Sequence, residues 1–233
     1  FTQQSQVENP NSEPPDINPK INANLSEINL TNSEVYDVLM SVNTRKANGP
    51  DGIGNRILKL LSQSISPLLT DLFNLSLYQT VFPATWKNAN VIPIHKKGSV
   101  NDCSNYRPVA LTSCLAKVFE RCIFKHVFNF FRDDNILSNL QSGFIPGDSC
   151  ANQLTYLYNF IARAMDEGKE IRAVFCDISK AFDRVWHKGL LHKLKSCGID
   201  GPLLNWFQSY LSNRSQRVVI NGYCSDFKPV LAG

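Results

Sequence analysis

The sequence lacks the features that mark membrane-spanning, secreted or zinc-binding chains. No apolar run is both long enough and uncharged enough to cross a bilayer, and no signal peptide is visible at the N-terminus. The seven cysteines include no CxxC pair. In a chain without a secretion signal, an odd number of thiols indicates reduced, intracellular cysteines. We therefore expect an intracellular protein with no membrane partner.

The sequence does contain enough apolar material for a folded core. Of its 233 residues, 43% are hydrophobic, and the net charge is only +4. A chain of this length can hold one large domain or two small ones. Acidic residues dominate before Arg45, and basic residues gather between Lys87 and Lys125. A basic middle region is typical of phosphate binding, although Lys117, Arg121 and Lys125 at helical spacing indicate a solvated helix face instead.

Periodicity and turn residues predict an α+β fold. Helical spacing of apolar residues predicts helices, and alternation bounded by turn residues predicts strands. Thr31 and Glu34 form a capping box, Pro67 is placed in the first turn of a helix, and Asn221-Gly222 predicts a hairpin turn. The expected helices lie near residues 31–42, 57–61, 67–77, 113–131, 149–165, 190–197 and 203–211, and the expected strands near 90–95, 107–111, 171–176, 216–220 and 227–231.

The stretch IRAVFCDISKAFDRVW, from Ile171 to Trp186, carries the most chemical information. Its alternating first half predicts a buried strand that ends at Asp177. An ionised carboxylate beside Phe175 is costly without a partner, and Mg²⁺ is a partner that favours carboxylate oxygen. The same residues also fit a helix N-cap at Asp177 and a plain core role for Phe182.

Five blocks resemble, in the same order, the reverse transcriptases of non-LTR (LINE-type, jockey-like) retrotransposons. The resemblance covers nearly all of the chain after about Leu30. It implies an incomplete reverse transcriptase fold, with the fingers and a partial palm of a right-hand polymerase. The blocks are Lys46–Gly52, Phe82–Lys87 with Val91–Gly98, Asn105–Leu111, Gln141–Phe144 and Asp177–Asp183.

The expected domains follow from composition and from this resemblance. Residues 1–28 are polar and proline-rich and predict a disordered linker, which the resemblance places after an upstream endonuclease. Residues 29–168 would form the fingers and the helices that support the palm. Residues 169–233 would form a partial palm, truncated before the paired-aspartate motif, because no Asp-Asp pair follows Asp177. The C-terminal palm and the thumb would be missing.

The resemblance also implies roles near the reacting atoms. Asp177 and the backbone carbonyl of Ile178 would bind Mg²⁺, with two ions in the intact enzyme and Mn²⁺ as the alternative ion. Phe182 would exclude a 2′-hydroxyl and so select deoxynucleotides. Asp183 matches the same block, but helix capping or hydrogen bonding near the site is the role we expect for it.

The earlier blocks imply contacts to the nucleotide and the template. Arg107 resembles the fingers arginine that lies over the triphosphate, and its guanidinium fork suits phosphate. Lys96 or Lys97 would make a second phosphate contact, and the strand register decides which. Ile145 stands where relatives often carry an arginine. The template path would be lined by Gln141, Gly143 and Phe144.

The resemblance therefore implies a fragment of an RNA-directed DNA polymerase from a mobile element. Its partners would be an RNA template, a DNA primer and deoxynucleoside triphosphates, with assembly in the cytoplasm and target-primed copying in the nucleus. We expect this chain alone to be inactive, because one carboxylate cannot hold two Mg²⁺ ions. Two alternatives stay open: a non-catalytic remnant that binds nucleic acid through its basic fingers, and an RNA-dependent RNA polymerase or intron maturase relative, disfavoured by Phe182 and Lys46–Gly52 respectively.

Overall fold

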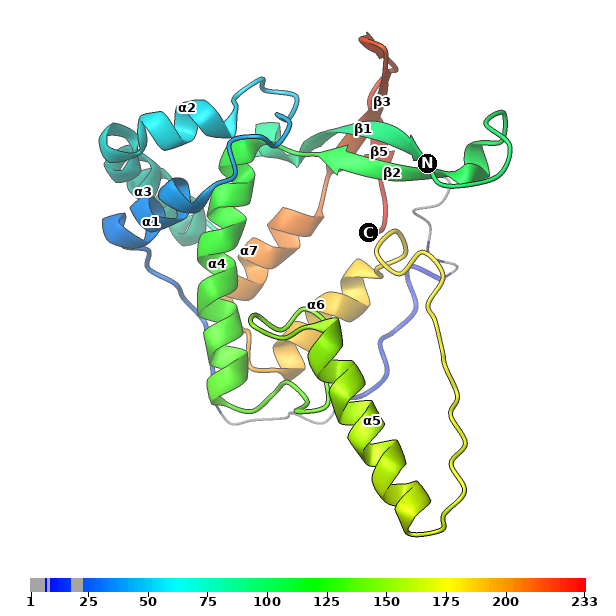
Figure 1. Ribbon diagram of the computed structural model, residues 1–233. Helices are drawn as coiled ribbons and strands as arrows, with labels where there is room; N and C mark the ends of the chain where they lie inside the picture. The colour runs from blue at the N-terminus through cyan, green and yellow to red at the C-terminus, as the bar shows by residue number, and fades with distance from the viewer. Residues whose placement is uncertain (1–6, 8, 18–22) are drawn as a thin grey trace.

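The computed structural model describes residues 7, 9–17 and 23–233. In that part of the chain seven α-helices accompany a small mixed sheet (Figure 1). The elements in chain order are α1 (Asn32–Ser41), α2 (Asn55–Leu60), α3 (Ser62–Tyr78), η1 (Ala84–Lys87, a 3₁₀ helix), β1 (Asn88–His95), η2 (Cys103–Asn105, also 3₁₀), β2 (Tyr106–Leu111), α4 (Cys114–Asp133), α5 (Cys150–Asp166), α6 (His187–Ser196), α7 (Gly201–Leu211), β3 (Arg214–Ile220), β4 (Tyr223–Cys224) and β5 (Lys228–Val230).

The sheet is built around β1 and β3, which run parallel to each other. The strand order is β2-β1-β3, and both β4 and β5 pair with β3. β2 runs antiparallel to β1 and places Arg107 opposite Ile94. The predicted hairpin turn is confirmed, because Asn221 and Gly222 have φ angles of 51° and 83°, the pair of positive values that a type I′ turn requires.

An aromatic core holds the helices together and ties them to the sheet. The rings of Phe73 on α3 and Phe119 on α4 stack with centroids 4.3 Å apart. Trp206 on α7 meets Phe119 edge-to-face at 5.1 Å, and Trp86, just before β1, meets Phe73 at 6.1 Å. Fully burying each such side chain contributes about 1.5–3 kcal/mol. This core therefore lies beside the start of β1 and the end of β2, which lead from η1 and into α4.

Local sequence signals predicted most of these elements correctly. The capping box is present, since the Thr31 N–H donates to a Glu34 carboxylate oxygen at 2.8 Å. One boundary prediction was wrong: α3 begins at Ser62, so Pro67 lies inside the helix and not in its first turn. Ser62 and Ser66 are both buried. A pattern counted on leucines alone misses a first turn whose core-facing residues are serines.

Two predictions between residues 149 and 176 were also wrong. Residues 171–176 are extended but pair with no strand of the described chain. A strand is stable only with ladder partners, so these residues do not form one here. α5 was expected to bury Leu154, Leu157, Tyr158 and Ile161, but none of its residues is buried. Figure 1 shows α5 and the extended segment standing out from the other helices.

The N-terminal segment reaches the helical core before the predicted boundary at residue 29. The Leu25 N–H donates to the Gly198 carbonyl at 2.8 Å, the Leu203 N–H donates to the Ser26 carbonyl at 2.9 Å, and Ile28 is buried. Part of the predicted linker, residues 1–6, 8 and 18–22, lies outside the described residues. None of the helices in the described ranges is long and apolar enough to cross a membrane.

Candidate functional site

Asp177 lies on the exposed extended segment, just before a tight turn. The Asp183 N–H donates to the Lys180 carbonyl at 3.0 Å, and Lys180 has a left-handed φ of 54°. Asp177 is exposed and Phe175 is 91% exposed. The argument that Asp177 needs a cation because it is buried beside Phe175 was therefore wrong. What remains is a carboxylate that a ligand can reach.

The groups at Asp177 are of a kind that can bind Mg²⁺. Its carboxylate and the Ile178 carbonyl are hard oxygen donors of the type that Mg²⁺ prefers. Within the described residues, no group of three or more His, Cys, Asp or Glu side chains could hold a metal ion. Proteins often bind Mg²⁺ through one or two carboxylates together with substrate phosphates. Asp177 therefore fits as one ligand, and a two-ion site would need further carboxylates.

Phe182 meets a residue of the predicted template block. The rings of Phe182 and Phe144 lie edge-to-face, with centroids 5.8 Å apart and planes at 77°. The turn that carries Phe182 is braced by Gly233, whose N–H donates to the Val185 carbonyl at 3.2 Å. A Cβ on Gly233 would lie 2.8 Å from the Phe182 carbonyl oxygen. The structure thus brings together two predicted site residues that are far apart in the sequence.

Hydrogen bonds close the predicted template block against the start of α5. The Gln141 side-chain amide donates to the Gly143 carbonyl at 3.0 Å, and the Ser142 hydroxyl donates to the Gln153 side chain on α5. Hydrogen bonds from the Ser142 side chain and the Ser149 backbone hold the pKa of Asp148 below its ordinary value. This loop is therefore anchored at its base, with Phe144 at its exposed tip.

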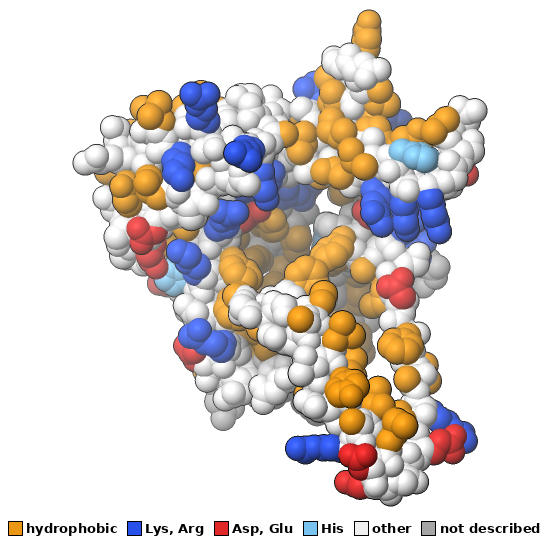
Figure 2. All heavy atoms as spheres, in the orientation of Figure 1, with side chains coloured by type: hydrophobic (Ala, Val, Ile, Leu, Met, Phe, Trp, Pro, Cys, Tyr) orange, Lys and Arg blue, Asp and Glu red, His pale blue; other side chains and the backbone are white. Residues whose placement is uncertain are grey.

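The register of β1 and β2 separates the two candidate lysines onto opposite faces of the sheet. Arg107 lies opposite Ile94, and opposite residues in a ladder share a sheet face. The ladder continues past β1, because the Lys96 N–H donates to the Asn105 carbonyl at 2.8 Å. Lys96, two residues after Ile94, is thus on the face of Arg107, and Lys97 is on the other. Figure 2 shows Lys and Arg side chains gathered at this end of the sheet.

A second basic surface, which the sequence interpretation had treated as a solvated face, surrounds a pocket of about 270 Å³. Lys46 from the first block and Lys117 and Arg121 from α4 line this pocket together. Glu120 lines it too, and burial raises the pKa of Glu120 although its Oε1 accepts a hydrogen bond from the Tyr210 hydroxyl at 3.1 Å. Helical spacing alone could not predict that Lys46 joins it.

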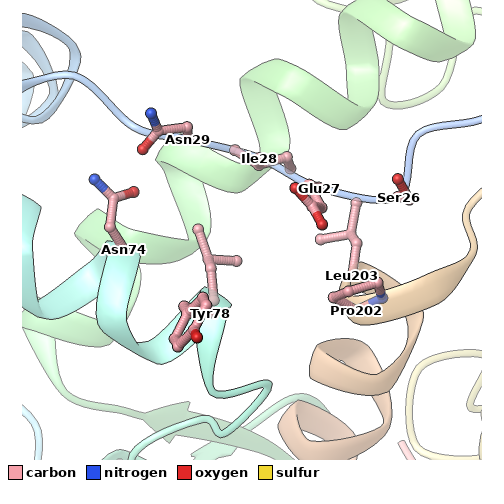
Figure 3. A pocket seen from close by; sticks show the side chains of 9 residues that line it. Ser26, Glu27, Ile28, Asn29, Asn74, Tyr78, Pro202 and Leu203 are labelled. Atoms are coloured by element: carbon pink, nitrogen blue, oxygen red, sulfur yellow. The ribbon is translucent and has the colours of Figure 1, made fainter.

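A larger cavity of about 450 Å³ lies between the N-terminal segment, α3 and α7 (Figure 3). Glu27, Tyr78 and Leu203 are among its lining residues. The side-chain amide of Asn74 is already used, because it accepts from the Leu30 N–H at 2.8 Å and donates to the Leu30 carbonyl at 2.9 Å. None of the predicted site residues lines this cavity. We therefore interpret it as a feature of the N-terminal attachment.

Comparison with known proteins found one matching family and several proteins of similar sequence. The family described as "Reverse transcriptase (RNA-dependent DNA polymerase)" matches residues 94–230. The chain is 35% identical over 205 residues to the "RNA-directed DNA polymerase from mobile element jockey" of Drosophila melanogaster, covering 88% of this chain and 22% of that protein. It is 35% identical over 192 residues to the "Probable RNA-directed DNA polymerase from transposon BS" of the same fly, covering 82% and 21%. The chain thus spans about a fifth of the length of these curated relatives.

Proposed function

Because the chain belongs to the reverse transcriptase family, we propose that it forms the nucleotide-binding part of an RNA-directed DNA polymerase from a non-LTR mobile element. In this proposal, residues 29–168 form the fingers and supporting helices, and residues 169–233 begin the palm. The observation that carries it is the contact of Phe182 with Phe144, because it joins a predicted nucleotide-contacting residue to the predicted template block. Residues 1–28 would connect to an upstream endonuclease.

The proposed mechanism divides nucleotide binding among three parts of the chain. Arg107 and Lys96, on one sheet face, bind the triphosphate of an incoming nucleotide. Phe182 lies beside the sugar and excludes a 2′-hydroxyl. Asp177 and the Ile178 carbonyl would hold magnesium, with Mn²⁺ as the alternative ion. The ion would supply neutralisation of phosphate charge and a lower pKa for the primer 3′-hydroxyl.

The template would lie along the loop that precedes α5. Gln141, Gly143 and Phe144 present this loop to it, and Asp183 acts in the turn that holds Phe182. The partners are thus an RNA template, a DNA primer and deoxynucleoside triphosphates, with target-primed copying in the nucleus.

Further parts of the polymerase would complete the nucleotide site, for which this chain supplies only one metal-binding carboxylate. Val174 and Phe175 are 86% and 91% exposed, although apolar residues alternate with the others as in a buried strand. We expect palm strands from outside this chain to pair with residues 171–178 and to bring the remaining carboxylates. The apolar side of α5 would be covered in the same assembly. Without them, the 233-residue chain should not extend a primer.

The strand register gives a matched test of triphosphate binding. In the full-length polymerase, Lys96→Gln should raise the KM for deoxynucleotides about tenfold, the size of a charge-assisted phosphate contact of about 1.4 kcal/mol. Lys97→Gln removes the same charge from the other face and should change KM less than twofold. Single-nucleotide insertion kinetics on an RNA template measures both. A larger effect from Lys97→Gln would contradict the assignment.

The basic pocket favours one alternative function. Lys46, Lys117 and Arg121 could bind the backbone phosphates of a nucleic acid without any chemistry at Asp177. A non-catalytic remnant of this kind would bind RNA with steep salt dependence and no requirement for Mg²⁺. It would also show no primer extension when the full-length protein is supplied with template, primer and nucleotides.

A further inference from the structure

We propose that Phe144 is a positioning residue for Phe182, whose ring it holds in place as the barrier to a ribonucleotide's 2′-hydroxyl. The inference rests on the proposed function, because the barrier role of Phe182 belongs to that proposal. It adds a determinant of sugar selectivity that lies in another loop. The barrier residue Phe182 and the residue that orients it, Phe144, would thus come from different blocks of the sequence.

The geometry of the two rings is that of a favourable aromatic pair. A centroid separation of 5.8 Å and an interplanar angle of 77° fall within the range that the ring quadrupole favours. Phe182 is nevertheless 71% exposed, so little else among the described residues restrains its ring. An exposed side chain without a neighbour exchanges rotamers on the picosecond to nanosecond timescale. The contact with Phe144 is therefore what favours one position of the Phe182 ring.

The backbone at Phe144 supports a role beyond filling space. Phe144 has a φ of 62°, a left-handed conformation that is rare for a bulky residue and costs free energy. Phe144 is also 83% exposed, so burial of its ring does not offset that cost. Strained residues of this kind cluster at binding and catalytic sites. Here the strain presents the Phe144 ring to Phe182.

The loop that carries Phe144 and the turn that carries Phe182 are both held by hydrogen bonds, so the contact between the rings can fix where the Phe182 ring lies. The Phe144 loop is attached to α5 through the Ser142 hydroxyl and Gln153. The Phe182 turn is attached to the C-terminal segment through Gly233 and Val185, and a ring nitrogen of His187 lies 3.0 Å from the Gly233 carbonyl oxygen. A ring held between two anchored loops can exclude a hydroxyl group by its volume. A ring free to swing away could not.

The positioning role predicts that losing the Phe144 ring lowers the preference for deoxynucleotides over ribonucleotides, separately from any change in the overall rate of insertion. Removing the Phe144 ring should let Phe182 swing aside and admit ribonucleotides more often. An edge-to-face pair accounts for a change of a few-fold to about tenfold. Phe144→Ala should therefore lower the ratio of kcat/KM for a deoxynucleotide to kcat/KM for the matching ribonucleotide by that factor. Phe144→Tyr, which keeps the ring, should restore most of it.

The experiment is single-nucleotide insertion by the full-length polymerase, with both sugars tested on one template–primer. Loss of template affinity through Phe144 lowers both rates and leaves their ratio unchanged, so the ratio reports on the barrier. Phe160→Ala is the matched control, because Phe160 on α5 is 61% exposed and has no aromatic partner among the described residues. This control should leave the ratio unchanged.

A double substitution separates the two proposals. If Phe144 acts through Phe182, Phe144→Ala should have no further effect on the ratio once Phe182→Ala is present. Full additivity of the two changes, or a ratio that Phe144→Ala leaves unchanged while Phe182→Ala lowers it, would overturn the positioning role alone. A ratio that Phe182→Ala leaves unchanged would instead overturn the proposed barrier, and the positioning role with it.

Discussion

The helical core and the segment from Ser142 to Asp183 contain the same kinds of aromatic residue in opposite environments. Phe73, Phe119 and Trp206 are at most 1% exposed, whereas Phe144 and Phe182 are 83% and 71% exposed. The core residues pack against one another within the chain. Among the described residues, the segment makes one contact between aromatic rings and pairs with no strand. The difference indicates that the aromatic core is packed within this chain, whereas the described residues leave the rings of the Ser142–Asp183 segment largely uncovered.

The largest expected effect tests this difference through stability. Phe119→Ala should lower the free energy of unfolding by about 3–5 kcal/mol, because it leaves a cavity in the aromatic core. Phe175→Ala removes the same ring from the extended segment and should change it by less than about 0.5 kcal/mol. Urea unfolding of the 233-residue chain measures both. Equal losses would show that residues 171–176 are packed in solution, contrary to the structure.

A smaller effect is expected where the scaffold depends on charge. Burial tends to raise the pKa of Glu34, but hydrogen bonds from Thr31 and the nearby His126 lower it overall, with His126 Nε2 2.9 Å from Glu34 Oε1. A carboxyl whose folded pKa is depressed contributes stability above its ordinary pKa, here 4.5, and loses it as pH falls through the folded value. Glu34→Gln keeps the acceptor oxygen of the capping box but removes the negative charge beside the helix N-terminus and His126, so it should cost about 0.5 kcal/mol at pH 7, and the cost should disappear on acidification below pH 4.5.

The control for this pH dependence is Asp71→Asn, a carboxylate on α3 that forms no ion pair among the described residues. Its unfolding free energy should follow that of the unmodified chain between pH 7 and pH 3.5. If Glu34→Gln also follows the unmodified chain at every pH, the charge of Glu34 does not stabilise α1.

Sequence reasoning succeeded where the cause of a structure is local. The capping box at Thr31, the Asn221-Gly222 turn and the periodicity of α4 each lie within a few residues, and each predicted its element. Periodicity also identified the residues of α5 and of the segment 171–176. It could not tell whether they have partners, because burial and strand pairing depend on distant parts of the chain.

In the candidate site, too, local sequence identified the residues, but contacts between distant parts of the chain could not be predicted. The motif residues Arg107, Asp177 and Phe182 were found from sequence blocks. Placing Lys96 and not Lys97 on the face of Arg107 needed the register of two strands, and the meeting of Phe144 with Phe182 needed the path of the chain between them. The predicted burial of Asp177 was wrong for a related reason: an apolar run shows what a strand could bury but not which surface is there to cover it.

The most direct test of the account is primer extension by the full-length polymerase that carries this chain, with an RNA template, Mg²⁺ and Asp177→Asn. Loss of the only carboxylate proposed as a metal ligand in this chain should reduce extension by at least about a thousandfold, comparable to the loss of other catalytic groups. Asp183→Asn, which changes a carboxylate in the turn that follows Asp177, should keep activity within about tenfold. An Asp177→Asn enzyme that extends primers as well as the Asp183→Asn enzyme would contradict the assignment of Asp177 as the catalytic carboxylate.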